Sequence, residues 1–175
     1  MELKINLQGL KNIEKMISEE PYRKALGRTL NRTKTKFKSV TTKEVRKTYN
    51  IRAKDLKQYI QLKKTGNLEW KFMVKGKQLG LEKFKPRQNK SSVSVMVKKG
   101  QRFKLSYAFL AKDKNGNIRV FERETKKRMP IDRLFSLSVP QMFNEKILGK
   151  GFKEAEQTFE KEFKHNLDYY LGKMK

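Results

Sequence analysis

Basic side chains at regular spacing are the feature of this sequence that most directly indicates chemistry. Lys24, Arg28, Arg32 and Lys36, here called the basic ridge, recur at steps of four, and residues four apart lie on one face of an α-helix. A row of cations can contact successive phosphates, and such contacts are salt-dependent and read no base sequence. The candidate residues for binding DNA or an acidic partner include five further cations: Lys43, Lys47, Lys85, Arg87 and Lys90.

The residues alone leave three interpretations of the basic ridge open. It could face DNA, it could contact acidic neighbouring subunits, or it could be a solvated helix face. The sequence contains no helix-turn-helix spacing, no aromatic RNA-recognition pattern and no zinc finger, which are the fingerprints of proteins that read bases. If the ridge meets nucleic acid, we therefore expect phosphate contacts without sequence readout.

Residues that support catalysis or metal binding are not grouped in this sequence. There is no Cys and His165 is the only His, which excludes thiolate zinc sites and cysteine nucleophiles. Asp113–Asn117 begins like a calcium loop, but the sixth position, which must be Gly in an EF-hand, is Ile118. Gly76–Gly80 and Gly149–Gly151 lack the pattern of a phosphate-binding loop. We therefore expect that the protein is not an enzyme and that it has no catalytic residue, no metal site and no cofactor.

The net charge bounds the kind of partner that the protein meets. The 175 residues include 44 Lys and Arg against 18 Asp and Glu, a net charge of +26. Such a charge repels itself, and an anionic partner relieves the repulsion. Nucleic acid, acidic subunits and an anionic membrane surface all qualify, while solubility alone usually needs a net charge of roughly 2–8. Residues 21–64 hold 15 basic and 2 acidic residues, so this quarter of the chain carries +13 of the +26.

The termini and the apolar runs indicate a soluble intracellular product. The first residues, Met1–Asn6, lack an apolar signal core. No apolar run approaches the ~18 residues that would span a bilayer. We therefore expect no membrane partner.

Helical spacing dominates the first third of the chain. Alternation over Glu2–Gln8 predicts a strand, and Leu10, Ile13 and Ile17 follow with the spacing of a short helix. A long helix is predicted over Pro21–Thr48. Its apolar face consists of residues at steps of three and four: Tyr22, Leu26, Leu30, Thr33, Phe37 and Val40.

The middle of the chain changes to alternation, which is typical of antiparallel β-structure. Gly66-Asn67 and Asp113–Asn117 are expected to be hairpin turns. The basic stretch Lys83–Lys90 is expected to be a mobile loop, and Met129–Ile131 begins a second irregular region. The fold class predicted from these patterns is α+β, with a long basic N-terminal helix packed on a twisted antiparallel sheet and with a C-terminal helix.

The C-terminal part is predicted to be helical. Ser138 and Pro140 suit the start of a helix, and a last helix is expected after Gly149 and Gly151. Residues 1–148 are expected to form the α+β domain, and residues 149–175 a helix that packs in the core or docks on a neighbouring subunit. The aromatic candidates for that interface share one face of the helix: Phe152, Phe159, Phe163 and Tyr170.

Several short motifs follow one another in order between about Ala25 and about Phe143. They are Ala25-Leu26, Leu30–Thr33, Tyr49–Ile51, Ala53–Leu56, Gly80-Leu81, Phe84, Pro86–Gln88, Val93–Val95, Lys99-Gly100, Ala108-Phe109, Val120–Arg123, Lys126–Ile131 and Ser138–Met142. In this order and spacing the chain resembles the phage minor tail protein Z family, the tail-completion proteins of long-tailed bacteriophages.

The resemblance implies a structural virion protein, made in the host cytoplasm, at the head-proximal end of the tail in the neck region. It implies copies of the chain in a ring that enables head–tail joining and contacts the DNA channel or the connector. The implied partners are tail terminator or tail tube proteins, head connector proteins and non-specifically bound genomic DNA. The alternative is a non-specific nucleic-acid-binding protein of the host or prophage.

Overall fold

The structure is a computed structural model that describes residues 2–5, 20–66, 69–125 and 127–173. The chain divides into two compact units. Unit 1 consists of Met1–Lys43, Ile60–Val74 and Asn144–Lys175, and unit 2 consists of Glu44–Tyr59 and Lys75–Phe143. Each unit therefore combines segments that are distant in the sequence.

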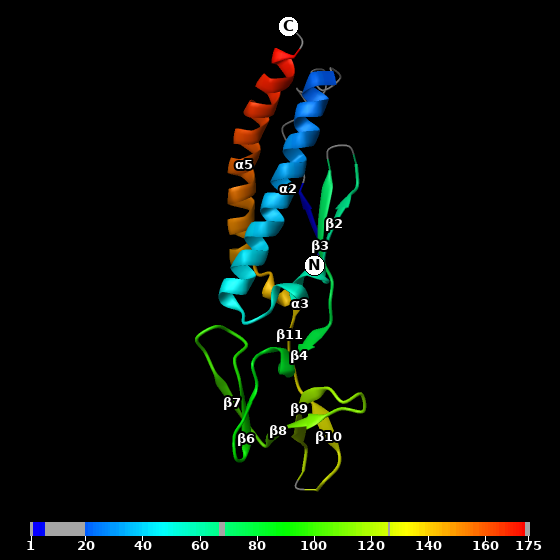
Figure 1. The fold of residues 1–175 in the computed structure, drawn as a ribbon, viewed down its shortest axis with the longest axis vertical. Helices are drawn as coiled ribbons and strands as arrows, with labels where there is room; N and C mark the ends of the chain where they lie inside the picture. The colour runs from blue at the N-terminus through cyan, green and yellow to red at the C-terminus, as the bar shows by residue number, and fades with distance from the viewer. Residues whose placement is uncertain (1, 6–19, 67–68, 126, 174–175) are drawn as a thin grey trace. The chain divides into compact units, whose positions relative to one another are not determined.

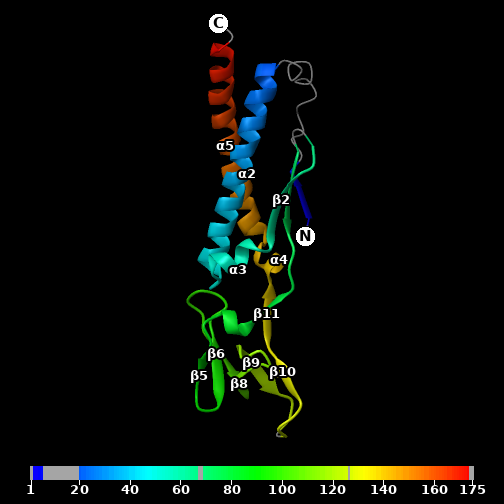
Figure 2. The ribbon, with the colours of Figure 1, turned by 45° about the vertical axis from the view of Figure 1, so that its right-hand side comes forward.

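Two long helices, α2 (Glu20–Thr48) and α5 (Glu145–Gly172), are the main elements of unit 1. They run side by side in both ribbon views (Figure 1, Figure 2). The pairing is antiparallel, because residues that meet follow opposite orders along the two helices: Phe37 with Phe152, Arg32 with Glu162, and Thr29 with Asn166.

The two helices approach each other most tightly at Gly151 of α5. A Cβ atom at this position would overlap the methyl group of Thr41 and press on the ring of Phe37, and both of these residues are fully buried. The Phe37 ring also packs on Phe152 and Phe72, with centroid separations of 5.0 and 5.1 Å. Phe37 is therefore the centre of the unit 1 core.

A buried polar contact also crosses the helix pair. Asn166 Nδ2 donates to Thr29 Oγ1 over 3.0 Å, and Thr29 Oγ1 donates to the carbonyl oxygen of Ala25 over 2.8 Å. Thr29 and Asn166 are at most 1% exposed. Burying a polar group costs free energy unless it is hydrogen-bonded, so this pair favours one register of α5 on α2.

A three-stranded antiparallel sheet with the order β1-β3-β2 completes unit 1. Strands β2 (Ile60–Lys64) and β3 (Trp70–Val74) form the predicted hairpin, and β1 (Glu2–Ile5) pairs with the other edge of β3. The sheet packs on α2 through Phe72, whose ring meets Phe37 edge to face.

Unit 2 contains three small antiparallel sheets, with the orders β10-β9-β8, β11-β4 and β5-β6-β7, within the described residues. Its strands are β4 (Gln78–Gly80), β5 (Arg87–Gln88), β6 (Ser92–Val95), β7 (Phe103–Ser106), β8 (Ala108–Lys112), β9 (Ile118–Arg123), β10 (Ile131–Arg133) and β11 (Phe135–Ser138). Its short helices are α3 (Ala53–Lys57), the 3₁₀ helix η2 (Leu81–Lys83) and α4 (Val139–Met142).

The core of unit 2 surrounds β6, which is buried along its whole length. Its serine hydroxyls are satisfied: Asn89 Nδ2 donates to Ser92 Oγ and Arg102 Nη1 donates to Ser94 Oγ, each over 3.2 Å. The buried apolar residues of unit 2 include Leu56, Phe84, Val93, Val120, Val139 and Met142.

The structure confirms the α+β class, the long N-terminal helix packed on a sheet, the C-terminal helix and the hairpin turn at Asp113–Asn117. Ser138 caps α4 as predicted, in a capping box in which Gln141 Oε1 accepts from the Ser138 backbone N–H over 2.9 Å. The strands form four small sheets in the described chain where the sequence favoured one. The helix predicted around Leu10, Ile13 and Ile17 lies outside the described residues.

Three predictions of secondary structure from the sequence are wrong. Lys83–Lys90 is not a loop throughout, because Arg87–Gln88 pairs with β6 and Phe84 is buried. The region after Met129 forms β10 and β11, which pair with β9 and β4. The last helix begins at Glu145, where the Asn144 side chain accepts from the Ile147 N–H over 3.0 Å. This cap starts the helix before the two glycines, which therefore lie inside it.

Replacing Gly151 by Ala should lower the free energy of unfolding by about 1–3 kcal/mol, the usual cost of overpacking a core. The matched control is Gly149→Ala on the same helix, because a Cβ there meets nothing within 4 Å. That change should raise the free energy of unfolding by up to about 1 kcal/mol, since Ala is a better helix former than Gly. Chemical denaturation measures both values, and a stabilising Gly151→Ala would contradict the close approach of α5 to α2.

The pKa of Asp113 in the β8–β9 turn is lowered to about 2, because its carboxylate accepts hydrogen bonds from the Arg119 side chain and from the Asn117 and Asn115 backbone. A depressed folded-state pKa contributes stability that is present above the unfolded value and is lost as the pH falls toward 2. Replacing Arg119 by Gln should raise this pKa toward its ordinary 3.8 and weaken the acid sensitivity. A carboxyl NMR titration measures the shift, and an unchanged midpoint would show that the backbone donors suffice.

Candidate functional site

The basic ridge lies along the contact between α2 and α5. Arg32 pairs with Glu162 of α5, and Lys36 Nζ lies 3.4 Å from the carboxylate of Glu154 on the same helix. The two remaining members have partners of other kinds. Lys24 pairs with Glu20 over 2.7 Å within α2, and the guanidinium of Arg28 lies 5.7 Å from the ring centroid of Tyr169.

These contacts change what the ridge offers to a partner. The side chains of Arg32 and Lys36 remain 43% and 46% exposed, and exposed ion pairs contribute only ~0.2–1 kcal/mol each. They nevertheless place a carboxylate next to each of these cations, which weakens the field that an approaching phosphate would meet. Farther along α2, Lys43 is exposed and Lys47 pairs with Glu44 over 2.5 Å.

A hollow of about 500 Å³ in unit 2, here called the basic hollow, gathers five cations. The residues that line it come from the end of α2, from η2 and from the segment after β6: Arg46, Asn50, Ile51, Arg52, Glu82, Lys83, Lys85 and Lys99. A hollow in which cations outnumber acidic side chains favours an anion over a neutral ligand.

Backbone hydrogen bonds bring these segments together. The N–H of Asn50 donates to the Val97 carbonyl oxygen over 2.8 Å, and the N–H of Lys99 donates to the Thr48 carbonyl oxygen over 2.9 Å. Tyr49 forms an isolated antiparallel bridge between these two bonds, with Lys98. Residues some fifty positions apart in the sequence therefore face one space.

Two cations of the basic hollow are held by a buried carboxylate. Asp55 accepts from Arg52 Nε over 2.8 Å and from Lys83 Nζ over 3.2 Å. Burial by itself raises the pKa of Asp55, but these hydrogen bonds and the two positive charges outweigh it and hold the pKa below its ordinary value. Asp55 therefore stays charged and fixes Arg52 and Lys83 in place.

The acid that lines the basic hollow is neutralised from another direction. Glu82 Oε1 accepts from Arg119 and from Arg133, each over 2.5 Å. Arg119 also pairs with Asp113 over 2.9 Å, so the two arginines of this cluster are balanced by two carboxylates. Glu82 therefore subtracts little from the field of the basic hollow.

Three cations of the basic hollow, Arg46, Lys85 and Lys99, are exposed and have no ion pair within the described part of the chain. Arg102 steadies the segment at Lys85, because its Nη1 donates to the Lys85 carbonyl oxygen over 3.3 Å and to the Ser94 carbonyl oxygen over 3.1 Å. A phosphate or carboxylate entering the hollow would meet three charges that nothing else in the described chain engages. Such contacts fix position and read no base sequence.

Of the three cations predicted to bind a partner in the basic stretch Lys83–Lys90, only Lys85 lines the basic hollow. Arg87 lies in β5, and Lys90 lines a separate cavity of about 620 Å³ with Tyr107 and Phe109. The predicted residues did not include Arg46, Arg52, Lys83 and Lys99, which also line the basic hollow. No periodicity joins these four residues, because contacts between segments distant in the sequence bring them together.

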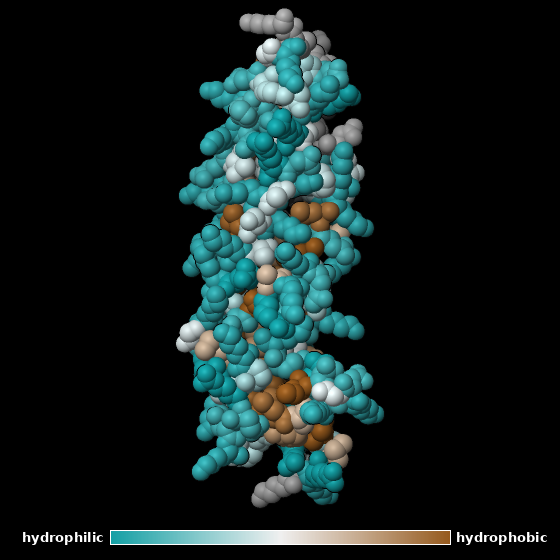
Figure 3. Space-filling model, in the orientation of Figure 1, coloured by the Kyte–Doolittle hydropathy of each residue, from teal (hydrophilic) through white to brown (hydrophobic). Residues whose placement is uncertain are grey.

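The predicted aromatic interface residues lie on α5 and are half-buried. Phe159 and Phe163 stack with centroids 5.7 Å apart, and Tyr170 meets Tyr169 at 5.2 Å. Phe152 and Phe159 line an apolar groove in unit 1. In the view of Figure 3 the surface is mostly hydrophilic, and apolar side chains gather in the region of β8 and β9 in unit 2.

The remaining expectations concern His165, metal binding and membrane-spanning helices. His165 is exposed on α5. Among the described residues there is no group of three or more His, Cys, Asp or Glu side chains able to hold a metal ion. Within the same residues, no helix is both long and apolar enough to cross a membrane.

Comparison with known proteins identifies the family. No curated protein matches the chain significantly, and no solved structure does. The model of the family described as prophage minor tail protein Z (GPZ) matches residues 4–175, nearly the whole chain. The chain therefore belongs to the prophage minor tail protein Z family, whose members are structural proteins of the phage tail and not enzymes.

Proposed function

We propose that this tail protein completes the head-proximal end of a phage tail and makes it competent for joining to a filled head. Several copies form a ring in the neck, between the tail terminator or tail tube proteins and the head connector. The basic hollow of each copy faces the DNA channel or an acidic connector surface. The family match supports the assignment to the tail.

The observation that carries the proposal is the basic hollow, with three unengaged cations in a structural tail protein. A chain with a charge of +26 gains stability when an anion relieves its self-repulsion. Phosphates of DNA passing through a ring would provide that charge without any sequence being read. Acidic side chains of a connector would provide it in a fixed geometry.

The cations predicted from the sequence have different roles in this proposal. Arg32 and Lys36 pair with carboxylates of α5, while 43% and 46% of their side-chain surface stays exposed to a partner. Lys24, Arg28, Lys43, Lys47, Arg87 and Lys90 remain candidate contacts with DNA or acidic subunits. Residues 149–175, with Phe152, Phe159, Phe163 and Tyr170, remain candidates for the contact with a neighbouring copy.

Deleting the gene from its phage should leave filled heads and tails of normal length that do not join, because the tail end that meets the connector is missing. Electron microscopy of the lysate and the titre of infectious particles measure this, and wild-type protein supplied in trans should restore joining. Cryo-EM of complete particles should show the protein at the neck. Density for it at the distal tip, or its absence from particles, would disprove the proposed position.

Reversing the three unengaged cations, with Arg46→Glu, Lys85→Glu and Lys99→Glu, should weaken binding to duplex DNA and reduce the slope of log affinity against log salt by roughly 2–3, since each phosphate contact contributes ~0.9. Fluorescence anisotropy over a salt series measures both. The matched control is Lys153→Glu, Lys161→Glu and Lys164→Glu on exposed positions of α5, which changes the net charge equally and should leave the slope unchanged.

The outcomes of this comparison separate the partners. Equal losses in the two variants would show that net charge matters and that the basic hollow is no site. If the hollow variant binds DNA normally but its particles fail to join, the hollow meets an acidic protein surface. If it loses DNA binding while joining proceeds normally, the basic hollow binds nucleic acid but takes no part in joining.

A further inference from the structure

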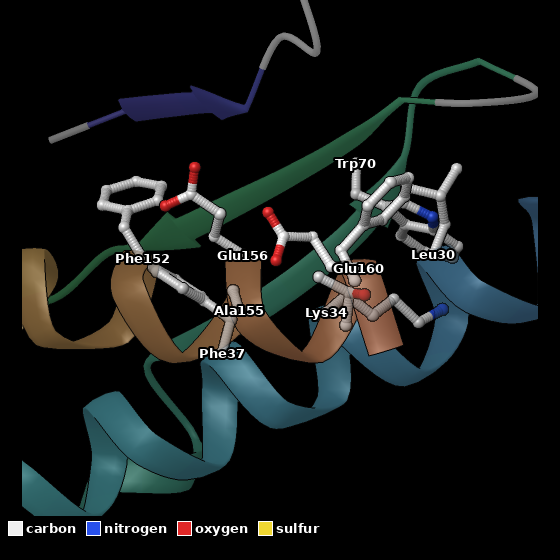
Figure 4. Close-up of a pocket in the computed structure, with 10 residues that line it drawn as sticks. Leu30, Lys34, Phe37, Trp70, Phe152, Ala155, Glu156 and Glu160 are labelled. Carbon is white, nitrogen blue, oxygen red and sulfur yellow. The ribbon is translucent and has the colours of Figure 1, made fainter. Parts of the chain in front are cut away.

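Unit 1 contains an apolar groove of about 490 Å³ between α2, β3 and α5. Its walls are aromatic, with Phe37 from α2, Trp70 from β3, and Phe152 and Phe159 from α5. In Figure 4, Phe152 lies at one end of the space and Trp70 at the other. Lys34, which also lines it, is engaged with the indole, since its Nζ lies 3.1 Å from the Trp70 ring centroid.

Two carboxylates stand at this groove. Glu156 and Glu160, one helical turn apart on α5, line it and project between the aromatic ends in Figure 4. Both are exposed, and neither has an ion pair among the residues that the structure describes. In a chain of net charge +26, an acidic pair beside an apolar groove selects a partner that is itself both basic and apolar.

The groove also holds a polar atom without a partner. Thr33 Oγ1 is buried at the wall and makes no hydrogen bond within the described chain. Buried hydroxyls are normally hydrogen-bonded. An occupant that brings a polar group into the groove would satisfy this atom.

The connection between β9 and β10 in unit 2 has the complementary character. Met129 is 61% exposed, and Lys127 and Arg128, which precede it, are exposed and have no ion pair among the described residues. An unbranched thioether fits irregular apolar spaces and packs favourably on aromatic rings. This segment therefore carries one apolar side chain and two cations in three consecutive positions.

We propose that residues Lys127–Met129 of one copy dock in the apolar groove of the next copy. Met129 enters between the aromatic rings, and Lys127 and Arg128 pair with Glu156 and Glu160. Because the two surfaces differ, the contact is heterologous, and its repetition closes a ring or extends a filament. The inference rests on the ring of the proposed function and names the contact that forms it.

Charge reversal tests this pairing in phage particles. The variants Lys127→Glu/Arg128→Glu and Glu156→Lys/Glu160→Lys should each lower the infectious titre and the amount of the protein per particle by about tenfold or more, because like charges would then meet at the interface. The chain carrying all four changes restores opposite charges and should recover to within about threefold of wild type. Circular dichroism of each purified variant separates loss of docking from loss of folding.

The recovery distinguishes pairing from a general effect of charge. If either double variant assembles like the wild type, the proposed contact is wrong. Suppose that both double variants fold but do not assemble, and that the chain with all four changes does not assemble either. The charges would then act separately, and the proposed pairing would again be wrong.

Cysteine cross-linking tests which chain occupies the groove, since the protein has no Cys of its own. Particles built with Met129→Cys/Glu160→Cys should yield a ladder of disulfide-linked multimers on a non-reducing gel. The control Lys114→Cys/Glu160→Cys places the first thiol in the exposed β8–β9 turn and should yield monomer. A disulfide confined within single chains, or no disulfide, would overturn docking on a second copy. Absence of the wild-type protein from particles would instead disprove the proposed function, whereas a neck ring without the ladder would leave that function standing and overturn only the docking.

Discussion

The close approach of α5 to α2 at Gly151 is the constraint on which the rest of unit 1 depends. Without a side chain at that position, Thr41 and Phe37 fill the space between the helices. Phe37 can then touch Phe152 on one side and Phe72 on the other, which joins both helices to the sheet. A tightly packed interior transmits changes of even one methyl group, so the apolar groove exists in its present shape because this contact sets the spacing of its walls.

Electrostatic pairing then divides the positive charge into two populations. Carboxylates of α5 lie opposite Arg32 and Lys36, so part of the positive charge is paired at the contact between the two helices. In unit 2, Asp55 and Glu82 are each held by two cations, whereas the exposed cations of the basic hollow have no such partner in the described chain. A long-range positive field with a local focus suits a protein that surrounds or meets a polyanion without reading its sequence.

Spacing within one element was enough to predict several features. Alternation and turn residues located the β2–β3 hairpin and the turn at Asp113–Asn117, and Ser138 marked a helix start. The start of α5 was predicted too late, after Gly149 and Gly151, whereas the Asn144 cap starts the helix at Glu145 and leaves both glycines inside it. The pairing of the ridge left a trace in the sequence, since Glu154 and Glu162 are eight residues apart and so share a face of α5.

The sequence by itself determined the family, the α+β class, the charge excess and the absence of thiol chemistry, because each depends on composition or on short-range order. Only the tertiary structure decided which cations are neutralised and which stay available. Arg46, Lys85 and Lys99 come together through backbone pairing between segments some fifty residues apart, and Arg32 meets Glu162 across 130 residues. Helical and strand periodicities carry information over one or two turns, whereas the partner of a charge is fixed by which elements pack together.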